Sequence, residues 1–158
     1  MTQQSNPVGA IVVDANIIIS IAANELTEPR ASAEVARYSA LGYEFFVPGV
    51  IVSETLYVLC GKLRDGTLSM TGHALAVRKA DAFLKRASPP PSGDAALLTR
   101  SEYIRGNYSC RHTSDGIYIA LAEELSQTRP TVILTFDQDL RNQAMRNAAT
   151  VTVQVLTI

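Results

Sequence analysis

Four acidic residues lie where carboxylates are unusual, inside or at the ends of apolar segments. Asp14 interrupts the β-branched run AIVVDANIII, and Asp137 ends the apolar run VILTF. Glu54 lies in the apolar segment VIVSETLYVL, and Asp115 begins the apolar segment of residues 114–126. Burying an unpaired carboxylate is costly, so acids in such places need a partner or a function. These four residues are therefore the candidates for chemistry.

A divalent cation would reconcile four carboxylates at one site. Converging carboxylates repel one another, and this repulsion raises their pKa values. Mg²⁺ and Mn²⁺ take oxygen ligands, and a water bound to such a metal becomes a nucleophile suited to phosphodiesters. The two histidines and two cysteines are not spaced as zinc ligands. The predicted cofactor is therefore Mg²⁺ or Mn²⁺, and the predicted chemistry is phosphodiester hydrolysis.

The elements that must position these acids alternate along the chain. Strands are predicted at residues 10–19, 44–48, 131–137 and 150–158. Helices are predicted at residues 27–41, 48–66, 71–84, 113–125 and 140–148, with one more capped by Asp94 after the SPPPSG loop. The strand at 10–19 is apolar throughout, as expected of a strand buried on both faces. This alternation predicts an α/β fold, a three-layer α/β/α sandwich with a mostly parallel central sheet.

Such a sheet predicts where the acids meet. Ligands of open α/β sheets bind at the carboxyl ends of the strands. Asp14 and Asp137 would both reach that edge. Asp115, in the first turn of its helix, would point there too, and the helix N-terminus favours its ionised form.

Each acid also has a structural explanation. Asp14 could cap a backbone group at a strand end, and Glu54 could face solvent on its helix. Asp115 could be an ordinary first-turn acid, and Asp137 could be the N-cap of the last helix. The joint occurrence of all four, in this order, favours the functional interpretation.

Length and composition predict one domain over residues 1–158, with a core at about residues 10–157. Hydrophobic residues make up 47% of the chain, which excludes disorder. Two cysteines, a start without basic residues and an apolar stretch broken by Asp14 and Asn16 predict a soluble cytoplasmic protein without a membrane segment.

The net charge of −1 excludes a polycation, so a nucleic acid would need a local patch. Arginines mixed with tyrosines suit single-stranded nucleic acid through phosphate contacts and base stacking. The alternative is a solvated helix face. The candidate RNA-binding residues are Arg100, Arg105, Arg111 and Arg141.

Four segments together resemble a known family. VVDANIII, VSETLYVL, TSDGIYIALAEEL and ILTFDQDL, in this order, resemble the four acidic motifs of PIN domains, and in particular those of VapC-type toxin ribonucleases. The resemblance covers about residues 10–157. It implies a PIN-like fold and Mg²⁺- or Mn²⁺-dependent hydrolysis of RNA to products with 5′-phosphate and 3′-hydroxyl ends.

The resemblance also implies roles for particular residues. The implied catalytic and metal-binding residues are Asp14, Glu54, Asp115 and Asp137. Asn16 matches a polar residue that often follows the first acid, and Thr135 matches the hydroxyl residue of the last motif. Asp139 is an outer acid or simply a helix-start residue.

The implied partners are RNA, an antitoxin protein that blocks the acidic pocket, and a second copy of the chain in a homodimer. The chain departs from the family in two places. Residues 70–110 form a longer stretch than in a minimal toxin, and Gly116 stands where the family more often has alanine.

Three other interpretations stay open from the residues alone. A PIN-like module could bind RNA or a protein without cutting it. A Toprim-type phosphoryl-transfer site would use Glu54 with the Asp137-x-Asp139 pair, which leaves Asp14 and Asp115 unexplained. A nucleotide-binding α/β domain would need a glycine-rich loop after its first strand, and the sequence has none there.

Overall fold

The computed structural model describes residues 7–106 and 114–157, and their strands form one parallel sheet. The strand order is β2-β1-β3-β4. The strands are β1 (Gly9–Val13), β2 (Tyr43–Phe46), β3 (Thr131–Thr135) and β4 (Thr152–Val155). The predicted parallel sheet is therefore confirmed, and every strand pair in it is parallel.

Helices fill the connections between these strands. They are α1 (Ala15–Ala22), α2 (Glu28–Ala40), α3 (Val50–Arg64), α4 (Met70–Leu84), the 3₁₀ helix η1 (Asp94–Leu97), α5 (Leu98–Gly106), α6 (Asp115–Ser126) and α7 (Gln138–Asn147). None of these helices is both long enough and apolar enough to cross a bilayer.

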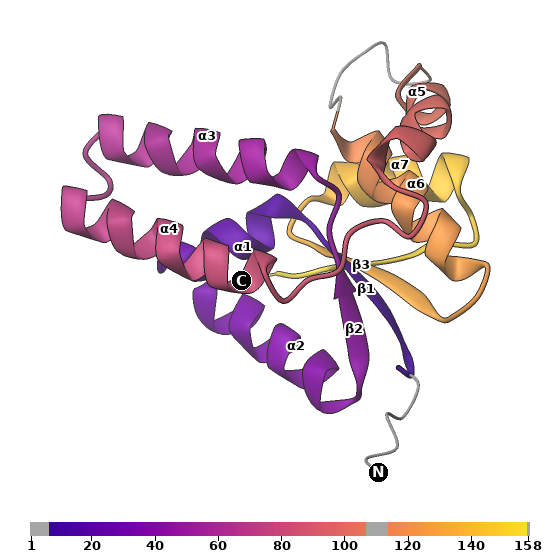
Figure 1. Ribbon diagram of the computed structural model, residues 1–158, viewed down its shortest axis with the longest axis horizontal. Helices are drawn as coiled ribbons and strands as arrows, with labels where there is room; N and C mark the ends of the chain where they lie inside the picture. Colours follow the sequence, from indigo (N-terminus) through magenta and orange to yellow (C-terminus); the bar gives the residue numbers. More distant parts are fainter. Residues whose placement is uncertain (1–6, 107–113, 158) are drawn as a thin grey trace.

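The helices cover both faces of the sheet. The connection from β1 to β2 runs one way along the sheet, and those from β2 to β3 and from β3 to β4 run the other way. Right-handed crossovers in opposite directions lie on opposite faces. Accordingly, α1 and α2 lie on one side of the sheet and α6 and α7 on the other, while α3 and α4 form a hairpin beside α1 (Figure 1). The predicted three-layer sandwich is confirmed.

The prediction of one continuous strand over residues 10–19 is wrong. Strand β1 ends at Val13, and α1 begins at Ala15. Asp14 lies between them in an extended conformation, and its carbonyl accepts a hydrogen bond from the Ile17 N–H at 3.1 Å. Since α1 is apolar and buried on nearly every side, its sequence lacks the polar face that distinguishes a helix from a buried strand.

Two predicted helix caps are also corrected. Helix α4 is capped by Ser69 rather than by Thr71, because the Ser69 Oγ accepts the Gly72 N–H at 3.0 Å. The Asp94 side chain does not cap the helix that follows it. Its Oδ1 accepts the Gly49 N–H at 2.8 Å, so Asp94 holds the start of α3 across the fold.

Candidate active site

The candidate site lies at the point where the strand order reverses. The chain leaves β1 toward β2 on one side and later returns to β3 on the other side of β1. The carboxyl ends of β1 and β3 therefore border the crevice in which open α/β sheets bind ligands. Asp14 follows β1 directly, and its N–H donates to the Leu134 carbonyl of β3 at 3.1 Å.

Two neutral side chains hold the Asp14 carboxylate. The Thr135 hydroxyl donates to Asp14 Oδ2 at 2.6 Å, and Asn16 Nδ2 donates to the same oxygen at 2.7 Å. The Asn16 Oδ1 in turn accepts the Phe136 N–H at 3.1 Å, which ties the start of α1 to the end of β3. Asn16 and Thr135, two of the three predicted supporting residues, thus both contact Asp14.

Two of the other acids lie near enough to Asp14 for their charges to act on its carboxyl. Asp14 is only 9% exposed, and the pKa of its carboxyl is raised from 3.8 to about 7, chiefly by burial. The charges of Asp115 and Glu54 contribute to this rise, while the hydrogen bond from Thr135 opposes it. The charges of Glu54 on α3 and of Asp115 on α6 therefore both act on Asp14 at the end of β1.

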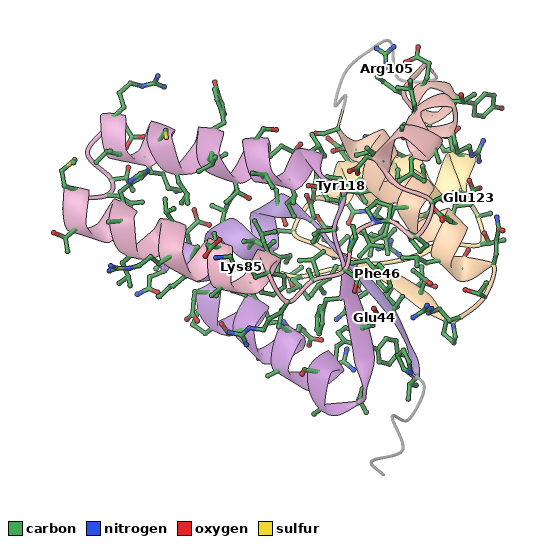
Figure 2. All side chains as sticks on the ribbon, in the orientation of Figure 1. Glu44, Phe46, Lys85, Arg105, Tyr118 and Glu123 are labelled. Carbon is green, nitrogen blue, oxygen red and sulfur yellow. The ribbon has the colours of Figure 1, made fainter. Side chains whose placement is uncertain are left out.

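The other two converging acids also have neutral donors. The Tyr118 hydroxyl of α6 donates to Glu54 Oε2 at 2.5 Å, in the space between α3 and α6 (Figure 2). Burial and the nearby charges of Asp14 and Glu54 raise the pKa of the Tyr118 phenol. The Gln143 side chain of α7 donates to Asp115 Oδ2 at 2.6 Å.

Tyr118 and Gln143 were not among the site residues predicted from the sequence. A signal for both was present, because each carries a polar group on the apolar face of its helix. Gln143 follows the buried Leu140 by three residues and precedes the buried Ala144. Tyr118 lies among the buried apolar residues of α6 and is 1% exposed.

The fourth acid serves as a helix cap. Asp137 Oδ1 accepts the Asp139 N–H at 2.7 Å and so caps α7. Asp137 is therefore the N-cap residue that its structural explanation predicted. Its own N–H donates to the Thr135 hydroxyl at 2.9 Å, so Asp137 also lies beside the Asp14 network. Asp139 is exposed in the first turn of α7.

The donor chemistry of this site fits a hard divalent cation. In residues 7–106 and 114–157, no three His, Cys, Asp or Glu side chains are grouped closely enough to form a ready metal cluster. Nevertheless, the charges of two other carboxylates raise the pKa of the buried Asp14. A bound cation would offset the repulsion between these like charges. Carboxylate oxygens are ligands that Mg²⁺ and Mn²⁺ accept.

The predicted RNA-binding arginines occupy different environments. Arg100 forms two hydrogen bonds to the Glu123 carboxylate, at 2.7 and 2.9 Å, and a third to the Asn147 carbonyl at 2.6 Å. Arg105 pairs with Glu102 on the same helix (Figure 2). Arg141 is exposed on α7, and Arg111 lies outside the described residues.

Helix α5 also shapes the space beside Asp115. Arg105 lines a cavity of about 450 Å³ between α3, α5 and the start of α6, together with Ser114, the residue before Asp115. A Cβ on Gly116 would lie 2.8 Å from the Ser101 carbonyl oxygen of α5. The absence of a side chain at Gly116 therefore allows α5 to pack against the first turn of α6.

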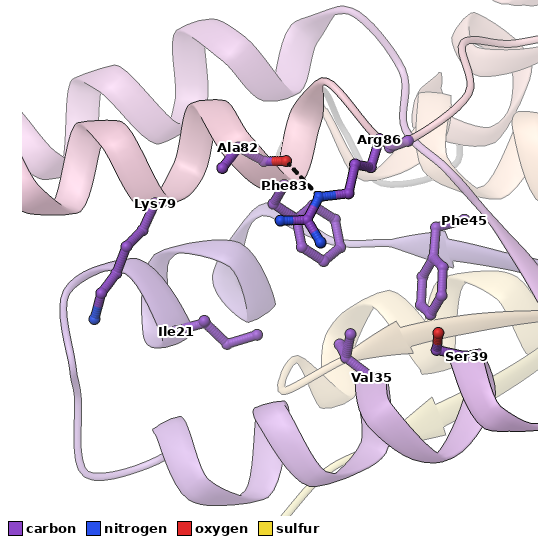
Figure 3. Close-up of a pocket in the computed structure, with 9 residues that line it drawn as sticks. Ile21, Val35, Ser39, Phe45, Lys79, Ala82, Phe83 and Arg86 are labelled. Atoms are coloured by element: carbon purple, nitrogen blue, oxygen red, sulfur yellow. Dashed lines mark hydrogen bonds between the residues drawn. The ribbon is translucent and has the colours of Figure 1, made fainter.

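A separate hollow lies in the α1, α2 and α4 layer (Figure 3). Its volume is about 440 Å³, and its lining contains two cations and no acid. Lys79 Nζ donates to Asn24 Oδ1 at 2.7 Å, and Arg86 Nε donates to the Ala82 carbonyl at 3.2 Å. The remaining lining is mostly apolar and includes Ile21, Val35, Phe45 and Phe83. This hollow offers no oxygen-rich metal site.

The fold and the site together define an α/β protein with carboxylates gathered at the switch point of a parallel sheet. A family model of the PIN domain matches residues 11–145, so the chain belongs to the PIN domain family. The resemblance noted in the sequence motifs is thereby confirmed.

Among solved structures, the fold is similar to that of a chain in the crystal structure of VapBC2 from Rickettsia felis bound to a DNA fragment from their promoter. The TM-score is 0.60 at 11% sequence identity, and the alignment covers 92% of this chain and 98% of that chain. At this identity the similarity shows the fold alone. A comparison with curated proteins found no match.

Proposed function

We propose that the chain is a metal-dependent endoribonuclease of PIN type that hydrolyses RNA phosphodiester bonds. Its catalytic and metal-binding residues are Asp14, Glu54, Asp115 and Asp137. The observation that carries the proposal is the convergence of Asp14, Glu54 and Asp115, which contributes to raising the pKa of Asp14 to about 7. Carboxylates brought together at such a cost are explained by a cation that binds them.

The proposed mechanism divides the work among the described residues. Asn16 and Thr135 orient Asp14, and Tyr118 orients Glu54. A bound Mg²⁺ or Mn²⁺ would supply a water of lowered pKa and would offset charge on the phosphoryl oxygens. Arg105, whose partner Glu102 lies three residues away on the same helix, and the exposed Arg141 would contact the RNA backbone. Arg100 is bonded instead to Glu123 on α6 and to the Asn147 carbonyl of α7.

We further propose that the protein is the toxin of a toxin–antitoxin pair, acting in the cytoplasm as a homodimer of single-domain chains. Support for an antitoxin partner comes from the PIN family match and the fold shared with a VapBC2 chain. Copurification with the product of an adjacent small gene, followed by loss of cleavage on adding that product, tests this part of the proposal.

The nuclease proposal is tested by cleavage of a mixed, end-labelled RNA pool that contains structured RNA. The pure protein is assayed with Mn²⁺, with Mg²⁺ and with chelator, beside Asp115→Asn and the control Asp81→Asn, which changes an exposed acid of α4. We expect metal-dependent cleavage that Asp115→Asn abolishes and Asp81→Asn preserves.

Other outcomes would support the rival interpretations. Cleavage that survives Asp115→Asn but is lost in Glu54→Gln would favour a Toprim-type site. A folded protein that binds RNA but cuts none of the pool with either metal would favour the non-catalytic module.

A further inference from the structure

A buried glutamine of α7 contacts the proposed site. Gln143 is 0% exposed, and its Nε2 donates to Asp115 Oδ2 at 2.6 Å. The two residues are 28 positions apart, and Gln143 is in the same helix that Asp137 caps. Gln143 therefore links the helix that begins at one proposed acid to the carboxylate of another.

The second polar atom of Gln143 makes its position costly. Its Oε1 is buried and has no hydrogen-bond partner in the part of the chain that the structure describes. A buried acceptor without a partner reduces stability, whereas methionine has a similar length and no such group. Packing alone thus does not account for a glutamine here.

The amide donor suits a carboxylate that must keep its charge. A lysine or arginine in this place would orient Asp115 but would also cancel the negative charge that a cation needs. A neutral amide fixes the carboxylate and leaves its charge in place. The charge of Asp115 acts on Asp14, which shows that this carboxylate contributes to the field of the site.

We propose that Gln143 is a positioning residue that holds the Asp115 carboxylate in the orientation required for a divalent cation. This inference rests on the proposed function. Groups that hydrogen-bond to metal ligands set the orientation of those ligands, and their removal weakens metal binding by about 10- to 100-fold.

The test compares Gln143→Met with the wild-type protein and with Gln138→Met, a control at an exposed position of the same helix. Mn²⁺ affinity is measured by titration calorimetry, and thermal stability is measured in chelator. We expect Gln143→Met to bind Mn²⁺ at least about tenfold more weakly while its metal-free melting temperature stays equal or rises. Gln138→Met should change neither quantity.

A double-mutant cycle identifies the residue through which Gln143 acts. In the Asp115→Asn background, Gln143→Met should weaken Mn²⁺ binding no further, because its target has already been changed. An equal loss in both backgrounds would overturn the inference, and so would unchanged Mn²⁺ affinity in Gln143→Met. If the wild-type protein itself bound no Mn²⁺, both the proposed function and this inference would be overturned.

Discussion

The acids at the sheet edge and the arginines of α5 are both charged groups near helix ends, yet the fold treats them differently. Within residues 7–106 and 114–157, neutral side chains donate to three of these carboxylates, namely Thr135 and Asn16 to Asp14, Tyr118 to Glu54, and Gln143 to Asp115. Arg100 and Arg105 are instead paired with the carboxylates of Glu123 and Glu102.

This difference distinguishes charged side chains that remain able to attract a ligand from charged side chains that stabilise the fold through ion pairs. A neutral donor orients a carboxylate without cancelling its charge, so the hydrogen bonds from Thr135, Tyr118 and Gln143 leave the negative charge of these acids in place. An ion pair cancels the charge, as between Arg100 and Glu123, and ties α5 to α6. The partner of a charged residue thus tells more about its role than the residue type does.

The largest expected effect comes from Asp14→Asn in metal-free protein. The folded carboxyl releases its proton at about pH 7, against 3.8 as its ordinary value. The folded state therefore binds more protons than the unfolded state between these values, and its stability falls as the pH rises through them. An asparagine can still accept both hydrogen bonds at this position. We expect Asp14→Asn to be more stable than wild type at pH 8 by about 4 kcal/mol.

Urea unfolding in chelator from pH 4 to pH 8 measures this effect, with Asp81→Asn as the control. The wild-type protein and Asp81→Asn should both lose stability across this range, and Asp14→Asn should lose less. A pH dependence in Asp14→Asn identical to that of wild type would show that ionisation of the Asp14 carboxyl does not lower the stability of the folded protein.

The next effect tests the contact of α5 with the acid-bearing helix. Gly116→Ala would place a methyl group 2.8 Å from the Ser101 backbone carbonyl, so α5 must shift. We expect a loss of about 2 kcal/mol in unfolding free energy. Gly61→Ala in α3 is the matched control, because its new methyl would meet nothing within 4 Å and alanine is the better helix former. Equal stability changes in the two variants would contradict the close packing of α5 on α6.

Tyr118→Phe removes one neutral donor from the acid site and leaves the aromatic ring in place. We expect Mn²⁺ affinity to fall about tenfold, because Glu54 loses the group that orients it. Tyr57→Phe on the exposed face of α3 should leave the affinity unchanged. Calorimetric titration measures the Mn²⁺ affinity of the two variants. Equal affinities would show that Tyr118 does not contribute to metal binding.

The smallest expected effect distinguishes the two arginines of α5. Arg100→Ala should lower the unfolding free energy by about 1 kcal/mol, because it breaks a bidentate pair and a bond to α7. Arg105→Ala should cost less than about 0.5 kcal/mol, as expected for a pair within one helix.

RNA binding should show the opposite order. Arg105→Ala should weaken binding and reduce its salt dependence, while Arg100→Ala should change both less. Fluorescence anisotropy at several salt concentrations, in chelator, measures this difference. A larger loss of RNA affinity in Arg100→Ala would show that its pairing with Glu123 opens for the ligand.

The sequence by itself singled out the candidate acids and determined the alternation of strands and helices and the family. These features are local, because the hydrophobic pattern that indicates a buried strand or helix extends over about ten to fifteen residues and each motif is short. The boundary at Asp14 escaped this reasoning, because an apolar helix that is buried all round has no polar face to mark it.

Only the tertiary structure decided which side chains donate hydrogen bonds to the acids and which arginines form ion pairs between helices. Tyr118 lies 64 positions from Glu54, and Thr135 lies 121 positions from Asp14. Such partners meet because β3 inserts beside β1 and because α6 and α7 pack on the same face. Sheet order and helix packing depend on the whole chain, so no local pattern reveals them.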